Sequence, residues 1–326
     1  MKVWYDACTG KHTRYGSAIG KEFRKRGHEF VFTTREHPDT LPLMKILGEK
    51  PVVVGKYDPT TNTSRLKESA QRIIEFADIF EKNGKPDVAV AHQSVELCRV
   101  AFGLGIPIIL TADTPHALAV NRLTIPFAHT VVVSEGLPIS FTKTYAAQRT
   151  VTFRGVDEAG WIQRSKPPKI KTKKPLIVLR QVETKAVYAK DKTDSAKNLA
   201  EKLAELGEVH LLERYNLTGK EFAQKPAFED SATLIAKADL VVSYGGTISR
   251  EAALLGVPSI AVSDMARTPV NRYTAKMGFP LFIISEQKVM ELAKRYLGRR
   301  FDVADKLAEM ENPVKVIADI AEKLEA

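Results

Sequence analysis

The sequence predicts an α/β protein built from two Rossmann-like, doubly wound parallel-sheet domains that face each other across a cleft. Three observations support this fold class. The chain has 326 residues, which at about 150 residues per domain corresponds to two domains. Short β-branched runs alternate with helical patterns, as in parallel sheets that are covered by helices. A segment rich in lysine and proline divides this alternation into two halves.

Seven strands are expected in the first half, each a short run of mainly β-branched or aromatic residues. They cover residues 3–5, 30–32, 52–54, 88–90, 108–110, 131–133 and 151–153. Between the third and fourth strands, residues 64–81 show helical spacing with one apolar and one charged face. We expect the apolar face to consist of Leu66, Ala70, Ile73, Ile74, Ala77 and Phe80.

The second half follows a linker near residues 162–174, where prolines alternate with the lysines Lys166, Lys169, Lys171, Lys173 and Lys174. Five more strands are expected at 176–179, 209–212, 240–242, 259–262 and 281–284. Asn312 and Pro313 then begin an amphipathic helix, in which Val314, Ile317, Ala321 and Leu324 recur at helical spacing. We therefore assign residues 1–165 to a first domain, 166–311 to a second domain and 312–326 to the terminal helix.

The composition excludes several classes of protein. Hydrophobic residues make up 44% of the chain, which supports a large core and excludes a disordered chain. The longest nearly apolar stretch, residues 100–110, is shorter than the roughly 20 residues that cross a bilayer. Asp6 interrupts any signal-peptide pattern, so a cytosolic location is expected.

The cysteines and the net charge limit the kinds of metal, ligand and partner that the sequence predicts. Cys8 and Cys98 form neither a redox pair nor a zinc motif, and we expect both to be buried. No His-Glu-x-x-His spacing occurs, so no metal is expected. The net charge of +10 favours anionic partners such as phosphates. Nucleic-acid binding is not expected, because the net positive charge is the sole feature of the sequence that supports it.

Ligands of open α/β sheets bind beyond the carboxyl ends of the strands, and polar residues follow these ends in the first half. They are Asp6, Thr9, His12, His92, Gln93, Asp113, His116, Ser134 and Glu135. We expect His12 to act as a general base that Asp6 or Asp113 orients, with His116 as a further catalytic candidate. Taken singly, each histidine is more typical of a hydrogen-bonded structural residue.

The most informative segment lies in the second half, where a strand runs into Gly245 and Gly246 and then into a helix. Two glycines let a ligand approach the backbone, and the helix start offers free amides with a partial positive charge, which suits a diphosphate. Thr247, Arg250 and Glu251 share one helical face, where Glu251 is expected to accept hydrogen bonds from a ribose diol. The alternative is a plain turn that Thr247 caps, with Arg250 paired locally.

Three further residues of the second half are candidates for the same ligand. Arg180 follows the strand at 176–179, and we expect it either to clamp a phosphate or to pair with Glu183. Asn271 and Arg272 lie near a helix start, where each either contacts the sugar of the ligand or caps that helix.

The segment from Gly245 to Pro258 contains Glu251-Ala252 and Gly256-Val257-Pro258. It resembles the donor-binding segment of the MurG-type glycosyltransferases and the non-hydrolysing UDP-N-acetylglucosamine 2-epimerases, both of the GT-B fold class. In those enzymes the matching glutamate binds ribose and the helix start binds diphosphate. The whole chain is similar to an uncharacterised prokaryotic family with this predicted fold. The matching positions are Met1 to Trp4, Asp6, His12, Glu96-Leu97, Arg99 to Pro107, His116, Asn121 to Leu123 and the Gly245 segment.

The resemblance implies a metal-independent glycosyltransferase that uses a nucleoside-diphosphate sugar, UDP-linked, as its donor. The second domain would bind the donor, and the first would present the hydroxyl of an unidentified acceptor. No cofactor is expected. Two alternatives remain open: an epimerase acting on the same nucleotide sugar, and a nucleotide or sugar-phosphate binding protein without turnover.

Overall fold

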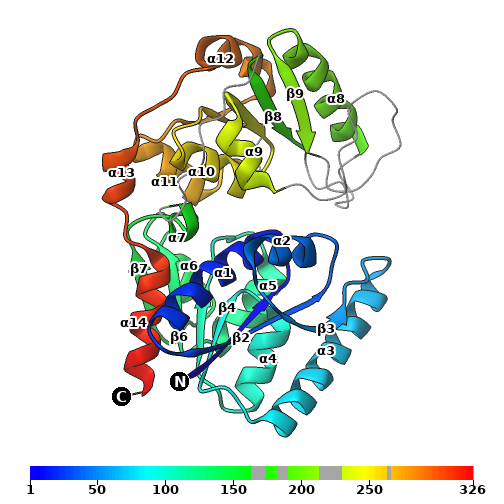
Figure 1. Ribbon diagram of the computed structural model, residues 1–326, viewed down its shortest axis with the longest axis vertical. Helices are drawn as coiled ribbons and strands as arrows, with labels where there is room; N and C mark the ends of the chain where they lie inside the picture. Colours follow the sequence, from blue (N-terminus) through cyan, green and yellow to red (C-terminus); the bar gives the residue numbers. More distant parts are fainter. Residues whose placement is uncertain (163–173, 182–189, 213–229, 263–265, 326) are drawn as a thin grey trace. The chain divides into compact units, whose positions relative to one another are not determined.

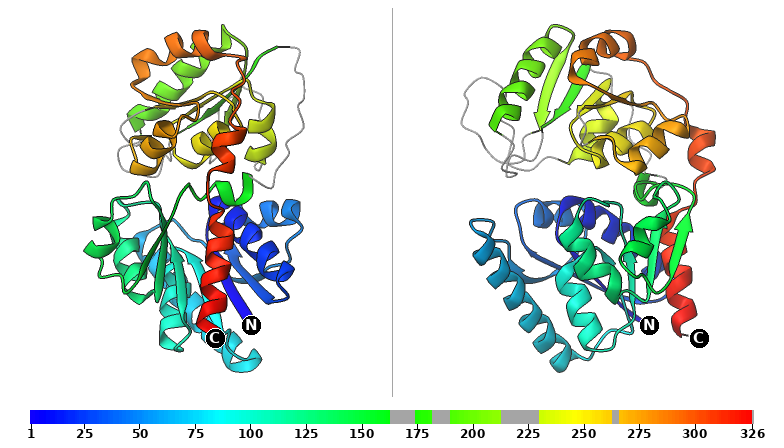
Figure 2. Two further views of the ribbon diagram at one scale, coloured as in Figure 1. Left: turned by 90° about the vertical axis from the view of Figure 1, so that its left-hand side faces the viewer. Right: turned by 180° about the vertical axis from the view of Figure 1, so that it is seen from behind.

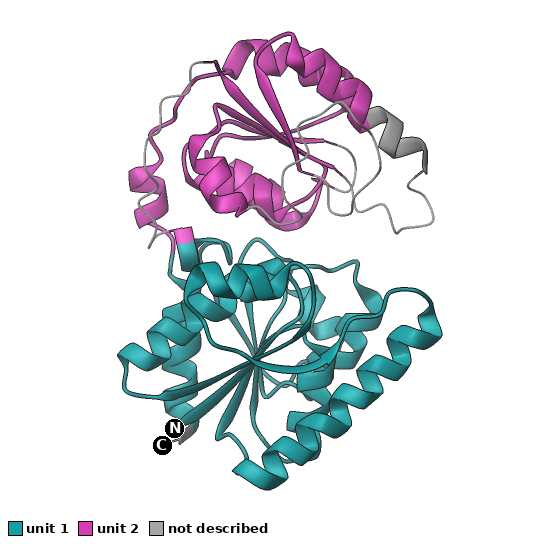
Figure 3. Ribbon diagram, turned by 45° about the vertical axis from the view of Figure 1, so that its right-hand side comes forward, with its two compact units in different colours: residues 1–161, 311–326 teal, residues 162–310 magenta. Residues whose placement is uncertain are grey.

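The computed structural model describes residues 1–162, 174–181, 190–212, 230–262 and 266–325. The chain forms two compact α/β units (Figure 3). Unit 1 comprises Met1–Trp161 and Glu311–Ala326, and unit 2 comprises Ile162–Met310. Most of the predicted lysine-proline linker, including Lys166, and the proposed partner Glu183 lie outside the described residues.

Unit 1 contains a seven-stranded, fully parallel sheet, and all seven predicted strands are confirmed (Figure 1). The strand order is β3-β2-β1-β4-β5-β6-β7. The strands are β1 Lys2–Ala7, β2 Glu29–Glu36, β3 Val52–Lys56, β4 Val88–His92, β5 Ile108–Thr111, β6 Thr130–Ser134 and β7 Thr150–Phe153. The order reverses direction between β1 and β4, so a gap between diverging loops opens at their carboxyl ends.

Helices cover both faces of this sheet (Figure 3). On one face α1 contacts α2 and α14, and on the other α4 contacts α3 and α5. The bounds are α1 Gly10–Lys25, α2 Thr40–Leu47, α3 Asn62–Asn83, α4 Val95–Gly103, α5 Leu118–Thr124, η1 Ile125–Phe127, α6 Ser140–Thr144, α7 Ala159–Ile162 and α14 Pro313–Glu325.

The terminal helix α14 completes unit 1, although it follows all of unit 2 in the sequence (Figure 2). Its predicted apolar residues Val314, Ile317 and Ala321 are buried. Arg26 of α1 forms ion pairs with Asp319 at 2.7 Å and with Glu322 at 2.9 Å. Apolar burial and these ion pairs together fix α14 on α1.

Unit 2 contains a five-stranded parallel sheet, again with every predicted strand present. The strand order is β12-β11-β10-β8-β9, so the order reverses between β8 and β10. The strands are β8 Leu176–Arg180, β9 Glu208–Leu212, β10 Leu240–Ser243, β11 Ser259–Val262 and β12 Leu281–Ile284.

Two apolar cores lie on opposite faces of the unit 2 sheet. Residues of α8 and α12 form one core, and residues of α9 and α10 form the other. The helices are α8 Lys190–Ala204, α9 Ser231–Lys237, α10 Thr247–Leu254, α11 Pro269–Lys276, η3 Glu286–Lys288, α12 Val289–Tyr296 and α13 Ala304–Ala308. Within the described ranges of both units, no helix combines the length and apolar character needed to span a membrane.

The predicted apolar face of α3 is wrong except for Phe80, which is buried as expected. Leu66 and Ile74 are exposed by 69% and 55%, respectively, and the buried face consists of Arg72, Phe76 and Phe80. The two phenylalanine rings pack edge-on against Trp4, with centroids 4.9 and 4.7 Å away. This aromatic contact turns the helix and carries Arg72, one turn earlier on the same stripe, into the interior.

Arg72 is stabilised there by polar partners from two strands. Its Nη2 donates to Asp6 Oδ1 at 2.8 Å, and its Nε donates to the Val54 carbonyl at 2.8 Å. Glu96 lies 3.5 Å from its Nη1. Because both members of the Asp6–Arg72 pair are almost fully buried, removal of either would leave a buried charge without its partner.

We expect Arg72→Met to lower the free energy of unfolding by about 3–5 kcal/mol, since the buried Asp6 carboxyl group would lose its cationic partner. Urea denaturation measures this loss. The matched control is Arg65→Met at an exposed position in the first turn of the same helix, which should cost less than about 0.5 kcal/mol. Equal losses for the two variants would show that the buried ion pair is not what holds α3.

Candidate functional site

Each unit carries a group of polar residues where its strand order reverses. In unit 1 this point lies between the carboxyl ends of β1 and β4, and in unit 2 between those of β8 and β10. Open α/β sheets bind ligands at such switch points, because the loops on either side diverge there. The two candidate sites are therefore built from the residues after these four strands.

Asp6 forms the buried base of the unit 1 site. Its Oδ1 accepts hydrogen bonds from Thr33 Oγ1 and Arg72 Nη2, both at 2.8 Å, and its Oδ2 accepts one from Ser94 Oγ at 2.7 Å. These contacts join β1 to β2, α3 and the start of α4. The expectation that Asp6 orients His12 is wrong, since its carboxylate is bound by these three other side chains.

Both cysteines are free and buried, as predicted. The Cys8 thiol lies 3.4 Å from Asp6 Oδ2. Burial, followed by the charges of Asp6 and Glu96, raises the pKa of the Cys8 thiol to about 12. Because a nucleophilic cysteine reacts as its thiolate, Cys8 is not suited to nucleophilic catalysis at neutral pH.

Above this base, Lys11 joins three acidic side chains. Its Nζ donates to Asp113 Oδ2 at 2.5 Å and to Asp157 Oδ2 at 2.8 Å, and it lies 3.8 Å from Glu158 Oε1. These residues are at least 88% buried, because the most exposed side chain, that of Lys11, is 12% accessible. One ammonium group thus bridges carboxylates that follow β5 and β7.

His92 borders the Lys11 cluster from the end of β4. Its Nε2 lies 3.6 Å from Asp113 Oδ1, and its Nδ1 lies 2.7 Å from Thr111 Oγ1. The ring of His12 meets the His92 ring edge-on, with centroids 5.0 Å apart. The structure therefore brings His12, His92 and Asp113 together, as expected from the strand ends.

His12 occupies the first turn of α1, whose N-cap is Thr9. Its side chain is partly exposed, and its Nδ1 accepts a hydrogen bond from the Cys8 amide at 3.4 Å. Burial lowers the pKa of His12 well below its usual value, with further lowering by His92, Lys11 and Arg35 and opposition from Asp113. The imidazole is consequently neutral at pH 7. His116, by contrast, lies exposed before α5.

Two groups of side chains in the described residues have the spacing of metal ligands: Asp6 with Cys8 and Glu96, and His92 with Asp113 and Asp157. Each already surrounds a basic side chain, Arg72 in the first group and Lys11 in the second. In each group, the internal cation already neutralises the carboxylates that a metal ion would require.

The glycine pair of unit 2 lies at its switch point. The Gly245 amide donates to Ser243 Oγ at 2.9 Å, and the Tyr244 amide donates to the Arg180 carbonyl of β8 at 3.3 Å. Gly246 is the N-cap of α10. The expectation that Thr247 caps this helix is therefore wrong. Since glycine has no side chain with which to cap, the first-turn amides of α10 have no cap from this residue.

A guanidinium group explains why position 246 is glycine. A Cβ atom there would lie 2.7 Å from Arg250 Nη1 and 3.6 Å from Asn271 Oδ1. Arg250 is buried and its Nη1 donates to Asn271 Oδ1 at 2.8 Å. The absence of a side chain at Gly246 thus lets a buried arginine pass beside the start of α10.

The other predicted residues of unit 2 differ in accessibility. Asn271 is buried and its Nδ2 donates to the Ala266 carbonyl at 2.8 Å, so its amide is used within the protein. Thr268 caps α11, which corrects the alternative that Asn271 or Arg272 does so. Arg272 is exposed, Glu251 is buried, and Arg180 and Thr247 are partly exposed.

Sequence reasoning missed Lys11, Arg72, Asp157 and Glu158. The acidic pair follows β7, so the strand-end rule that selected Asp113 would have selected it too if applied to the seventh strand. Lys11 lies between Thr9 and His12, which the same rule selected, so the rule would have selected it as well. No sequence pattern indicated Arg72. The face of α3 that contains Arg72 carries fewer apolar residues than the opposite face, so the apolar count favoured the opposite face.

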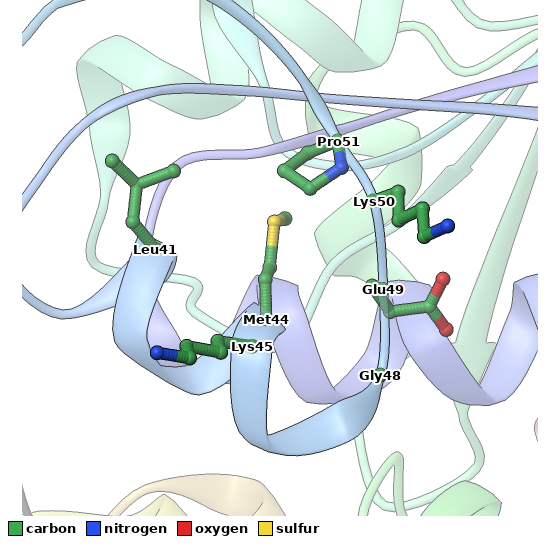
Figure 4. Close-up of a pocket in the computed structure, with 7 residues that line it drawn as sticks. All are labelled: Leu41, Met44, Lys45, Gly48, Glu49, Lys50 and Pro51. Atoms are coloured by element: carbon green, nitrogen blue, oxygen red, sulfur yellow. The ribbon is translucent and has the colours of Figure 1, made fainter.

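One surface cavity, of about 340 Å³, lies between α2 and the start of β3. Figure 4 shows Met44 between Leu41 and Pro51, with Lys50 extending to one side. Glu49, also in its lining, accepts hydrogen bonds from Ser17 and Arg24 of α1. None of the predicted site residues lines this cavity, so it is separate from the candidate sites.

The family model described as "Protein of unknown function (DUF354)" matches residues 1–325, and the chain belongs to this family. The prediction of an uncharacterised family is thereby confirmed. The chain is 26% identical over 340 residues to Uncharacterized protein MJ0665 of Methanocaldococcus jannaschii. That alignment covers 97% of this chain and 96% of the relative.

Two solved structures illustrate the fold. A putative UDP-N-acetylglucosamine 2-epimerase from Listeria monocytogenes is similar with a TM-score of 0.73 and 13% identity, covering 99% of this chain and 96% of its own. Spinosyn forosaminyltransferase SpnP is similar with a TM-score of 0.65 and 13% identity over 100% of both chains. Identities this low establish the fold alone. They confirm the prediction of two α/β domains of the GT-B-like class.

The glycine pair offers a matched test of the unit 2 geometry. We expect Gly246→Ala to lower the free energy of unfolding by about 1–3 kcal/mol, because its Cβ would displace the buried Arg250 side chain. Gly245→Ala is the control, since the nearest atom to a Cβ there is Ser243 Oγ at 3.6 Å. Chemical denaturation of both variants measures the difference. Similar losses at the two positions would contradict this account of Gly246.

Proposed function

We propose that this protein is an enzyme that acts on a nucleoside-diphosphate sugar and transfers the sugar to an acceptor. The proposal rests mainly on one observation: at the unit 2 switch point, a glycine-capped helix start lies beside a buried arginine and one turn before a buried carboxylate. Free amides at a helix start bind phosphate oxygens. A carboxylate further along the helix is repelled by phosphate and suits a ribose diol.

The same groups account for leaving-group stabilisation. As the sugar departs, negative charge develops on the diphosphate, and amides fixed before the reaction stabilise it without reorganisation. Arg180, at the end of the neighbouring strand β8, and Arg272, exposed on α11, are the proposed cationic contacts. Gly245, Gly246, Thr247 and Arg250 form the helix start itself. In this proposal, the backbone amides and arginines of the protein supply the positive charge that stabilises the diphosphate.

Unit 1 is the proposed acceptor domain. His12 and Asp113 lie at its switch point, and the more exposed His116 follows β5. These three side chains are proposed to contact the acceptor and the reacting sugar. The ion pair with Lys11 holds the Asp113 carboxylate in place. The UDP base, the acceptor class and a cytosolic location remain predictions from the sequence.

The ribose assignment can be tested with a ligand that lacks one hydroxyl group. We expect UDP to bind more tightly than 2′-deoxy-UDP by about 10-fold to 100-fold, because a hydrogen bond to a charged group contributes about 1.5–3 kcal/mol. Glu251→Ala should weaken UDP binding and abolish this preference for the hydroxyl. Isothermal titration calorimetry measures all four affinities.

Two further variants make this result interpretable. Glu291→Ala removes an exposed carboxylate from α12 of the same unit and should retain the preference for UDP. Glu251→Gln preserves the shape of the buried side chain if the alanine variant is unstable. A Glu251→Ala protein that still prefers UDP over its deoxy analogue would refute the ribose role. No measurable binding of UDP to the parent protein would refute the proposed function.

Epimerisation of the same nucleotide sugar is the second candidate. It is favoured by the several titratable groups that meet at the unit 1 switch point, His12, His92, Asp113 and Asp157, since elimination and re-addition need paired acids and bases. The higher TM-score of the epimerase structure is consistent with this candidate but establishes the fold alone.

Incubation of the protein with UDP-N-acetylglucosamine alone in deuterated water separates the two reactions. For a transferase we expect no epimer and no deuterium at the sugar carbons, because the reaction needs an acceptor. Nuclear magnetic resonance of the recovered nucleotide sugar gives both readouts. An epimer that carries solvent deuterium at the inverted carbon would show that the protein is an epimerase, and the proposed sugar transfer would be rejected. A control without protein corrects for spontaneous exchange.

A further inference from the structure

The hydrogen bond between the Cys8 amide and His12 determines where the imidazole carries its proton. The Cys8 N–H donates to His12 Nδ1 at 3.4 Å, and a nitrogen that accepts a hydrogen bond bears no proton. A neutral imidazole has one N–H group, so the proton lies on Nε2. The backbone at the end of β1 thus selects the Nε2–H tautomer.

The surroundings of His12 favour this neutral form over the imidazolium. His12 lies in the first turn of α1, where the helix dipole is positive and disfavours another positive charge. Lys11 of the same helix, Arg35 of β2 and His92 of β4 act in the same direction as burial and lower the pKa of His12. Asp113 acts in the opposite direction, but its carboxylate is bound by Lys11 at 2.5 Å.

The Nε2–H group is available to a ligand. The side chain is partly exposed at the switch point of unit 1. Across the described ranges, the sole side-chain hydrogen bond recorded for His12 is the one that Nδ1 accepts, and its other close neighbour is the His92 ring. A donor held by a helix start and a backbone amide is positioned before the ligand arrives.

We propose that His12 acts as a neutral hydrogen-bond donor, through Nε2, to an oxygen atom of the bound sugar or acceptor. This role differs from that of the general base expected from the sequence, because a nitrogen that already bears a proton cannot take another from a hydroxyl group. The donor role rests on the proposed function solely for the identity of the ligand. Asp113 is then the candidate carboxylate for proton transfer at this edge of unit 1.

The tautomer can be measured in the ligand-free, full-length protein. Long-range proton–nitrogen correlation spectra of protein labelled with ¹⁵N-histidine distinguish Nδ1–H from Nε2–H, and the spectrum of His12→Gln assigns the His12 signals by their loss. We expect the Nε2–H tautomer of a neutral imidazole at pH 7. An Nδ1–H tautomer, or an imidazolium at pH 7, would overturn the inference.

A pair of substitutions tests the donor role itself. Glutamine retains an N–H donor at His12 but cannot serve as a base, whereas alanine retains neither property. We expect the affinity for UDP-N-acetylglucosamine, or the turnover, to be about 10-fold lower in His12→Ala than in His12→Gln. Equal losses in the two folded variants would overturn the donor role. If the parent binds no nucleotide sugar, the proposed function fails, and the spectra still decide the tautomer independently.

Discussion

The buried ion pair between Asp6 and Arg72 organises the carboxyl edge of unit 1. Asp6 also accepts hydrogen bonds from Thr33 and Ser94, so one carboxylate joins β1, β2, α3 and the start of α4. These elements converge at the strand-order reversal between β1 and β4. Because the pair is buried from water, it fixes the end of β1, which is followed by Cys8 and by the first turn of α1 with His12. The geometry of the neighbouring polar groups follows from that.

Internal cations recur at both switch points. Arg72 and Lys11 neutralise carboxylates in unit 1, and Arg250 lies beside the glycine of α10 in unit 2. Each is placed by contacts within its own unit, so the positive charge is fixed before any ligand binds. Electrostatic preorganisation of this kind reduces the reorganisation that a reaction would otherwise require. The electrostatics of these sites therefore depend on individual buried cations. The net charge of +10 does not indicate where those cations lie.

The strands were predictable from the sequence because each is a short apolar run bounded by polar or turn residues, and a parallel sheet buries both faces. The strand-end rule brought His12, His92 and Asp113 together correctly. It could not supply strand order, which decides where the switch points lie. The face of α3 was mispredicted because a tertiary contact with Trp4 outweighed the apolar count. The partners of Lys11 and Asp6 likewise depend on long-range contacts that no local pattern encodes.

The placement of α14 makes unit 1 discontinuous in the chain, with unit 2 inserted between Trp161 and Glu311. During synthesis, the surface of α1 that receives α14 stays uncovered while the ribosome adds the whole of the second unit. Domains that are continuous in sequence can fold as they emerge, but this one cannot finish folding until α14 has been synthesised. Unit 2 is thus able to mature first, and a ribosome that stalls within it leaves an incomplete amino-terminal domain for chaperones and proteases to recognise.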